Sequence, residues 1–253
     1  MYLVIRVFLL VQEKLKSSLK EIFAWTRQRL SLSEWRQLRP FRWGSLRRLT
    51  PVSRLFGCDR GQPIDRYYIE RFLSGQQLDI KGCVLEIGDD TYTKKFGGAR
   101  ITKSEVLHIA EGNPKATIVA DLTRADHIPS GIFDCIICTQ TLQFIYDVPA
   151  ATRTLHRILK PGGVLLATFS GISQISRYDM DRWGDYWRFT DASARQLFSE
   201  AFGLANVTIT THGNVLVACS YLHGLGAQDL EQSEVEYDDP DYQVLITVRA
   251  IKA

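Results

Sequence analysis

Polar residues or a glycine follow directly after several apolar runs of this chain. Glu86 and Gly88 close one run, Asp121 closes another, and Thr139 and Gln140 close a third. If these runs are parallel strands of one open sheet, their carboxyl ends meet at the edge where such sheets bind ligands. The spacing therefore predicts a ligand-binding crevice that these five residues line.

The first of these runs leads into an unusual loop, LEIGDDTYTKKFGG, at residues 85–98. A dinucleotide-binding loop has the pattern G-x-G-x-x-G, which lets a pyrophosphate lie on a helix N-terminus. Here Asp89 and Asp90 would stand beside two phosphates, and like charges a few ångströms apart cost on the order of 1 kcal/mol even in water. S-adenosylmethionine has a sulfonium and an ammonium group and no phosphate, so acidic neighbours favour it. The loop predicts an S-adenosylmethionine site that includes Asp89 and Tyr92.

Strands and helices alternate along the part of the chain that carries these residues. This alternation is typical of an α/β fold with a doubly wound, mostly parallel sheet of the Rossmann type. The last two strands follow the last expected helix directly, so we expect an antiparallel edge. The expected helices are 65–75, 148–163 and 191–203, and the seven expected strands are 82–88, 104–110, 116–122, 133–139, 163–169, 205–213 and 242–252.

Charge divides the chain into two parts. Residues 1–60 hold 13 Lys and Arg against 4 Asp and Glu, whereas the rest holds 18 against 24. Breaks at Pro and Gly predict a basic helical N-terminal extension, 1–60, and one domain, 61–253. The apolar opening of about a dozen residues is shorter than the roughly 20 that a spanning helix needs. The basic amphipathic helix after it fits either contact with an anionic membrane or a cap on the domain.

The cysteines do not suggest a metal site. Their number is five, and Cys135 and Cys138 lie in the apolar run FDCIIC, which we expect to be a buried strand. Positions three apart on a strand point to opposite faces, so these two thiols cannot hold one ion. A reduced, cytoplasmic protein without a metal is the simplest interpretation.

Four segments together resemble a protein family. VLEIGDD, ATIVADL, FDCIICTQTLQFIYDV and LHRILKPGGVLLATF are similar to class I S-adenosylmethionine-dependent methyltransferases, in the large type-11-like group. The resemblance runs from about Gly61 to the C-terminus, and RILKPGG is its most specific piece. GQPIDRYYIERFL and DMDRWGDYWRFT resemble a bacterial subgroup found with glycosyltransferases and polysaccharide-assembly enzymes. That subgroup implies a sugar or a glycosylated small molecule as acceptor.

The resemblance also implies roles for single residues toward the cofactor. Glu86 matches the acid near the methionine amino group, and Gly88 the glycine that lets the backbone approach closely. The acid for the ribose hydroxyls has no clear match, because Glu111 comes one residue late. Arg66 matches a position that closes over the cofactor and offers two parallel hydrogen bonds to its carboxylate, although Asp65 with Arg66 also fits a helix-start salt bridge. The remaining matches are Tyr67 beside Arg66, Asp121 and Leu122 at the adenine, and Thr139 and Gln140 at the cofactor floor.

The acceptor is expected at residues 177–190, RYDMDRWGDYWRFT, which follow the fifth strand. Aromatic faces stack on sugar rings, while Asp and Arg side chains bond their hydroxyls. A lid packed by its tryptophans, with salt bridges on its surface, is the alternative. The candidate general bases are Asp179, Asp181 and His212, and the candidate acceptor-binding residues are Tyr178, Arg182, Trp183, Trp187 and Arg188.

These observations leave functions of different classes open. The first is O-methylation of a sugar or another small hydroxylated acceptor in the cytoplasm, with peripheral contact to the inner face of the membrane through the N-terminal helix as an option. The second is a non-catalytic partner with this fold in an envelope or glycan assembly complex, which the unusual loop favours. A nucleic-acid methyltransferase fits the basic extension but not the net charge of −6 on residues 61–253, because phosphate binding needs a basic surface. We therefore expect no nucleic-acid partner.

Overall fold

A computed structural model describes residues 44–253, and the amphipathic helix expected before them lies outside the described residues. The chain divides into two units, residues 1–49 and 50–253. Of the first unit the structure describes a short 3₁₀ helix, Gly44–Leu46. The second unit begins ten residues before the expected boundary at 60. It does so because the Val52 and Ser53 amides both donate to the His223 carbonyl, and Phe56 packs against the apolar core.

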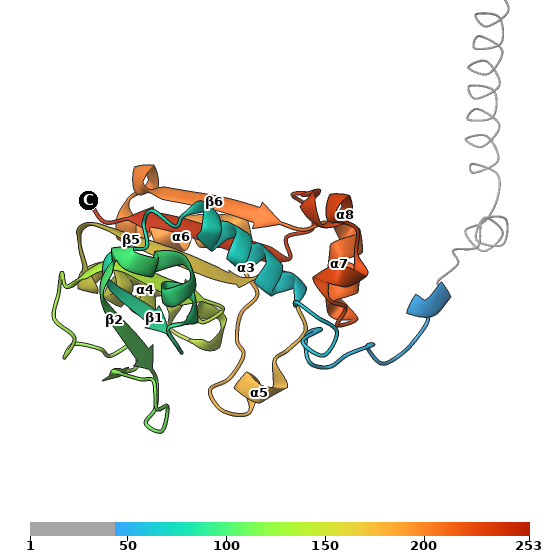
Figure 1. Cartoon of the computed structure of the whole chain (residues 1–253), viewed down its shortest axis with the longest axis horizontal. Helices are drawn as coiled ribbons and strands as arrows, with labels where there is room; N and C mark the ends of the chain where they lie inside the picture. Colours follow the sequence, from blue (N-terminus) through green and yellow to red (C-terminus); the bar gives the residue numbers. More distant parts are fainter. Residues whose placement is uncertain (1–43) are drawn as a thin grey trace, which may run out of the picture. The chain divides into compact units, whose positions relative to one another are not determined.

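The second unit is built on one seven-stranded sheet with the order β3-β2-β1-β4-β5-β7-β6 (Figure 1). β7 runs antiparallel to both of its neighbours, and every other pair is parallel. The expected α/β fold with an antiparallel edge is therefore confirmed. The strands are β1 Gly82–Ile87, β2 Ile101–His108, β3 Ile118–Val119, β4 Phe133–Thr139, β5 Leu159–Ser170, β6 Val207–His212 and β7 Leu245–Ile251.

Helices cover both faces of this sheet. One apolar core lies between the sheet and helices α4 and α6, and the other lies between the sheet and helices α3 and α7. Cys138 belongs to the first core and Cys135 to the second, so the expected alternation of their faces along β4 is confirmed. The helices are α3 Ile64–Gly75, α4 Val148–Ile158, α5 Arg177–Met180, α6 Asp191–Phe202, α7 Val215–Leu222 and α8 Gln232–Glu236.

Local signals explain where the helices begin and end. The Asp147 side chain accepts from the Ala150 amide at the start of α4, and the Thr190 side chain accepts from the Ser193 amide at the start of α6. α4 ends at Ile158 rather than at 163, because the residue before Pro161 disfavours helical backbone and β5 already begins at Leu159.

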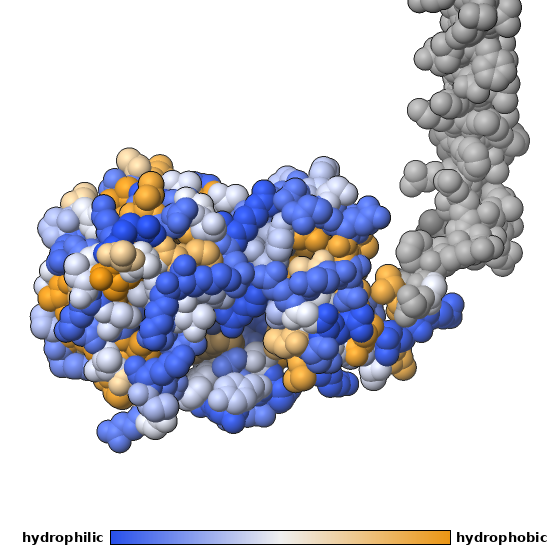
Figure 2. All heavy atoms as spheres, viewed as in Figure 1, coloured by the Kyte–Doolittle hydropathy of each residue, from blue (hydrophilic) through white to orange (hydrophobic). Residues whose placement is uncertain are grey.

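Two helices between β6 and β7 were not expected from the sequence. The Asn214 side chain accepts from the Val217 amide and so starts α7, and α8 follows at Gln232–Glu236. No helix within residues 44–253 has the length and apolarity needed to cross a membrane. The face drawn in Figure 2 is mostly hydrophilic over this unit, with apolar side chains in small groups.

Candidate functional site

A cavity of about 930 Å³ lies at the carboxyl ends of β1, β2, β4 and β5. Its volume falls in the range of roughly 300–1,000 Å³ that is usual for small-ligand sites. All five residues that end the apolar runs line it, namely Glu86, Gly88, Asp121, Thr139 and Gln140. The structure thus brings together the crevice residues expected from the sequence.

Gly88 leaves the cavity open at the end of β1. Its φ is +94°, a conformation that side chains rarely adopt, and a Cβ built on it would meet no atom within 4 Å. The Asn113 side chain donates to the Gly88 carbonyl at 2.7 Å and fixes this turn. The backbone here is therefore held in place with free space beside it, which allows the close approach of a ligand.

The two aspartates of the loop have different surroundings. Asp89 lines the cavity, and its carboxylate accepts from the Thr91 amide at 2.9 Å. Asp90 lies outside the cavity wall and forms ion pairs with Lys94 and Lys115, which hold the pKa of its carboxyl below the usual range. Only Asp89 of this pair therefore presents its charge to the cavity.

Glu86 is a buried carboxylate that also shapes the loop. Its side chain accepts from the Tyr92 amide at 3.1 Å and from the Thr93 amide at 2.7 Å, and the residue is only 2% exposed. Burial raises the pKa of Glu86 to about 7, although the hydrogen bonds from Thr93 and Tyr92 oppose this. Glu86 thus caps the turn after β1 and lines the cavity at the same time.

Tyr92 occupies the place of a loop glycine without closing the cavity. Its side chain is largely buried, and its hydroxyl accepts a hydrogen bond from the Arg66 guanidinium at 2.7 Å. Both residues line the cavity. The tyrosine therefore holds Arg66 at the wall beside β1.

Gln140 carries both strain and an unsatisfied polar atom. Its φ is +49°, which is rare for a residue other than glycine and costs on the order of 1–3 kcal/mol. Its side-chain oxygen accepts from Gln143 and Ser170, at 2.6 and 2.9 Å. Its side-chain nitrogen is buried and finds no partner within residues 44–253. This donor at the cavity wall is therefore free to bond a group that enters the cavity.

The ends of β2 and β3 contribute a histidine and an aspartate. Glu111 is exposed and lies outside the cavity, whereas His108, the last residue of β2, lines it. The His108 Nδ1 lies 2.7 Å from the Ala110 carbonyl, and its ring meets the Trp183 ring edge-on. The sequence did not indicate His108, because the family resemblance implies an acid at the end of this strand. Asp121 and Leu122 line the cavity as expected.

The segment after β5, residues 171–189, forms one wall of the cavity. Its two ends meet, because the Phe189 amide donates to the Ser170 carbonyl at 3.0 Å. The Asp185 side chain, 1% exposed, pairs with Arg188 at 2.6 Å and accepts from the Ser176 amide. Bonds within the segment therefore contribute to its shape.

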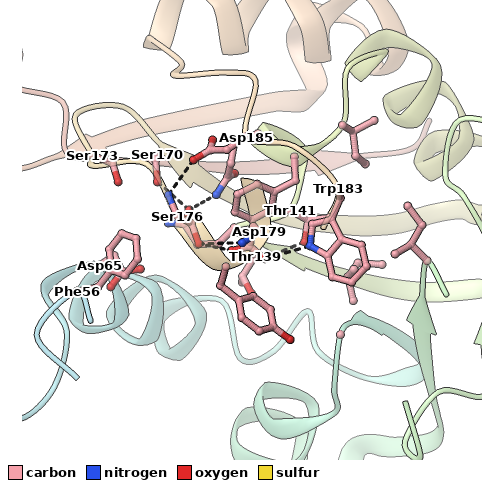
Figure 3. Close-up of a pocket in the computed structure, with 18 of the residues that line it drawn as sticks. Phe56, Asp65, Thr139, Thr141, Ser170, Ser173, Ser176, Asp179, Trp183 and Asp185 are labelled. Carbon is pink, nitrogen blue, oxygen red and sulfur yellow. Dashed lines mark hydrogen bonds between the residues drawn. The ribbon is translucent and has the colours of Figure 1, made fainter. Parts of the chain in front are cut away.

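Four of the residues expected to face the acceptor lie on this wall: Tyr178, Asp179, Trp183 and Arg188. The Asp179 carboxylate accepts from the Ser176 hydroxyl and from the Trp183 indole nitrogen, the latter at 3.1 Å. Asp179 thus serves the internal bonding of the segment (Figure 3).

Three other residues of this segment lie outside the cavity wall. Asp181 is exposed and pairs with Arg177 at 3.3 Å. The Arg182 guanidinium stacks on the Tyr178 ring at 3.5 Å. The Trp187 indole donates to the Ile145 carbonyl at 3.1 Å and turns toward the surface. None of these three side chains lines the cavity, although Arg177 and Tyr178, which two of them contact, do.

Tyr67 and His212 also lie away from the cavity. The Tyr67 hydroxyl accepts from Gln232 at 2.8 Å, because successive positions of α3 point in different directions. His212 stacks on Tyr68 with ring centres 5.2 Å apart, and its Nδ1 lies 3.4 Å from Asp238. Burial lowers the pKa of His212.

A wall that the sequence did not indicate completes the cavity. It comes from the segment before α3, from the first turn of α3 and from α7, through Arg54, Phe56, Cys58, Asp65 and Tyr221. Figure 3 shows Asp65 and Phe56 on one side of the cavity and Trp183 on the other. Within residues 44–253 no group of three or more His, Cys, Asp or Glu side chains is placed to hold a metal ion.

Sequence comparisons give one family match, which covers part of the sheet. Residues 94–167 match the family described as "Methyltransferase domain". Sequence comparison with curated proteins gave no match.

Solved structures similar to this chain share little sequence with it. The YcgJ protein of Bacillus subtilis is 13% identical, with a TM-score of 0.45 over 72% of this chain and 98% of that one. An S-adenosylmethionine-dependent methyltransferase of Archaeoglobus fulgidus is 12% identical, with a TM-score of 0.46 over 74% and 90%. A Haemonchus contortus phosphoethanolamine N-methyltransferase, bound to S-adenosylhomocysteine, is 14% identical, with a TM-score of 0.46 over 77% and 58%.

Proposed function

We propose that this chain, of which residues 94–167 match a methyltransferase domain, methylates a hydroxyl oxygen of a sugar or another small hydroxylated acceptor. S-adenosylmethionine is the cofactor, and when bound it supplies a methyl group on a positively charged sulfur. The work of the protein is then to align the acceptor oxygen with that methyl group and to manage the hydroxyl proton.

The residues at the strand ends fit this cofactor. Free space beside the Gly88 backbone admits a ligand, and the buried Gln140 nitrogen offers a donor to it. Glu86, Asp89 and Asp121 give this end of the cavity an acidic character that suits a cationic guest. In this proposal Glu86 and Asp89 face the charged methionine part, Asp121 and Leu122 face the adenine, and Arg66 faces the carboxylate.

One observation carries the choice of a hydroxylated acceptor. The cavity continues from the strand ends to the segment 171–189, where the Ser173 and Ser176 side chains and the Tyr178 and Trp183 rings line it. Small hydroxyl groups exchange hydrogen bonds with an acceptor, and aromatic faces cover the apolar faces of a sugar ring. Such a wall supports a small polar ring as the acceptor.

Two measurements on the full chain test the proposal. Titration calorimetry with S-adenosylmethionine and S-adenosylhomocysteine should give saturable binding, and its absence would remove the function. Transfer of label from methyl-tritiated S-adenosylmethionine to a panel of methyl glycosides should then give O-methyl products, identified by NMR. Transfer to amines or carbon acceptors in place of the glycosides would refute O-methylation while keeping the cofactor.

The non-catalytic alternative rested on the unusual loop. Tyr92 leaves a large cavity open beside Gly88, which supports cofactor use over an interaction platform. Turnover with any acceptor would exclude the alternative.

The wider setting is part of the same proposal. We infer that the acceptor belongs to bacterial glycan assembly and that the basic residues 1–60 contact the anionic inner face of the membrane. Sedimentation of the full chain with anionic vesicles, but not with neutral ones, is the expected result. If the chain sediments with neither kind of vesicle, the membrane contact is wrong and the enzymatic proposal is unaffected.

A further inference from the structure

The three bases expected from the sequence are engaged elsewhere. Asp179 accepts hydrogen bonds from Ser176 and Trp183, Asp181 pairs with Arg177 outside the cavity, and His212 stacks on Tyr68 away from it. A hydroxyl acceptor still has to lose its proton, so another group on the cavity wall must receive it.

Asp65 is a carboxylate on the acceptor side of the cavity. It lies in the first turn of α3, and one of its oxygens accepts from the Arg66 amide at 2.8 Å. It lines the cavity together with Phe56, Ser173 and Tyr221, and Figure 3 shows Asp65 beside Phe56. Unlike Asp79 or Asp229, which form bidentate pairs with arginines, Asp65 has no ion pair within 4.0 Å among residues 44–253.

Asp65 is partly buried and has charged neighbours. Burial raises the pKa of its carboxyl, while the positive charge of Arg66 and the hydrogen bond from the Arg66 amide oppose the rise. The charged and titratable groups on the adjoining walls are Arg66 on α3, Tyr221 on α7, Arg54 and Cys58 on the segment before α3, and Arg177, Asp179, Asp185 and Arg188 on the segment after β5. The side chain is thus partly withdrawn from water but still reached from the cavity.

We propose that Asp65 is the general base of methyl transfer. Its carboxylate takes the proton from the acceptor hydroxyl as that oxygen bonds to the methyl carbon, and the electron pair of the methyl–sulfur bond stays on sulfur. The products are the methyl ether, a neutral thioether and a protonated Asp65, which returns its proton to water. The assignment rests on the proposed function, because only a hydroxyl acceptor needs this base.

The first test is kinetic and uses the methyl glycoside that the wild-type chain methylates fastest. Asp65→Asn should lower kcat by about 10²–10⁴-fold, the range for loss of general base catalysis. Asp181→Asn, an exposed acid outside the cavity, is the matched control and should keep the wild-type kcat. Calorimetry with S-adenosylhomocysteine should show dissociation constants within about twofold for all three chains, as expected if only a proton transfer step is lost.

The second readout is the pH profile. The wild-type kcat/KM should fall with decreasing pH through the pKa of Asp65, because the base must be ionised. Asp65→Asn should remove this acid limb. Replacement of a residue with a merely structural role would leave this acid limb in place.

The third readout needs no acceptor. A carboxyl ¹³C NMR titration of the full chain, assigned with Asp65→Asn, should show Asp65 titrating above the ordinary aspartate range, and a value within that range would overturn the assignment. Wild-type kcat in Asp65→Asn would also overturn it, and turnover would then still support the proposed function. No methylation of any glycoside by a wild-type chain that binds S-adenosylhomocysteine would remove the hydroxyl acceptor and the base together.

Discussion

Replacing Glu86 by Gln tests whether one buried carboxyl makes stability depend on pH. In the folded chain burial raises the pKa of Glu86 from 4.5 to about 7. Between these two values the folded chain keeps a proton that the unfolded chain has released, so the free energy of unfolding falls as the pH rises. This contribution is complete below pH 4.5 and lost as the pH rises through 7.

The magnitude follows from the separation of the two pKa values. One pKa unit corresponds to about 1.36 kcal/mol, so a separation of roughly 2.5 units gives a loss of about 3 kcal/mol. The residue is only 2% exposed, so little of this is screened by solvent. Gln has the shape of Glu but does not titrate, and this component of the pH dependence should disappear in the variant.

Urea unfolding at about pH 4.5 and pH 8 measures the effect. From the lower to the higher pH, the free energy of unfolding of Glu86→Gln should rise by about 3 kcal/mol relative to that of the wild type. Other titrating groups cancel in this comparison. Glu111→Gln, an exposed acid outside the cavity, is the control and should follow the wild type at both pH values. A difference between Glu86→Gln and wild type that stays constant with pH would refute the reasoning.

S-adenosylhomocysteine extends the same experiment to the site. Its ammonium group favours the ionised form of a nearby carboxyl, so the ligand should stabilise the wild type more at pH 8 than at pH 5. Glu86→Gln should show less of this pH dependence. Equal pH dependence in both chains would place the ammonium group away from Glu86.

Substitutions at three further sites, with matched controls, have distinct expected outcomes. Gly88→Ala places a Cβ at φ +94° and into the open space, so stability should fall by about 1–2 kcal/mol in urea unfolding and calorimetry should show weaker S-adenosylhomocysteine binding; unchanged affinity would place the ligand elsewhere. Gln140→Gly and Gln140→Ala both lose the bonds from Gln143 and Ser170, but only glycine relieves the strain at φ +49°, so Gln140→Gly should unfold at a higher urea concentration than Gln140→Ala while both bind S-adenosylhomocysteine less tightly than wild type; equal stability of the two variants would contradict the strain. Asp185→Ala leaves a partly buried Arg188 without its partner and should cost about 2 kcal/mol, less than a fully buried pair, whereas Asp181→Ala at an exposed pair should change stability by less than about 0.5 kcal/mol; equal costs would show that burial does not matter here.

The sequence predicted the part of the cavity at the strand ends better than the walls beyond it, because strand ends are local features. Glu86, Gly88, Asp121, Thr139 and Gln140 each end an apolar run, and a parallel sheet brings such ends together without further information. The acceptor wall depends on how α3 and α7 pack across the sheet. No spacing in the chain indicates this packing.

The largest differences between the structure and the expectations from the sequence have physical reasons. His212 also ends a strand that runs parallel to β5, but β7 lies between them, and two strand spacings of about 4.8 Å carry it away from the cavity. The residues of α7 form a continuous apolar run without helical spacing, so only the Asn214 cap signals a helix. The sequence indicates Asp65 only as a partner of Arg66 at the start of a helix. The packing of α3 against α7 and the segment after β5 brings it to the cavity wall.

The closed shape of the segment 171–189 has a consequence for how such a protein diversifies. Its ends are tied together at Ser170 and Phe189, but the Tyr186 and Trp187 amides also donate to the Gln143 carbonyl, and the Ile172 amide donates to the Gln243 carbonyl. The shape of the segment therefore depends on the loop after β4 and on the residues before β7. A graft of this stretch from a relative would keep its shape only if those partner carbonyls came with it.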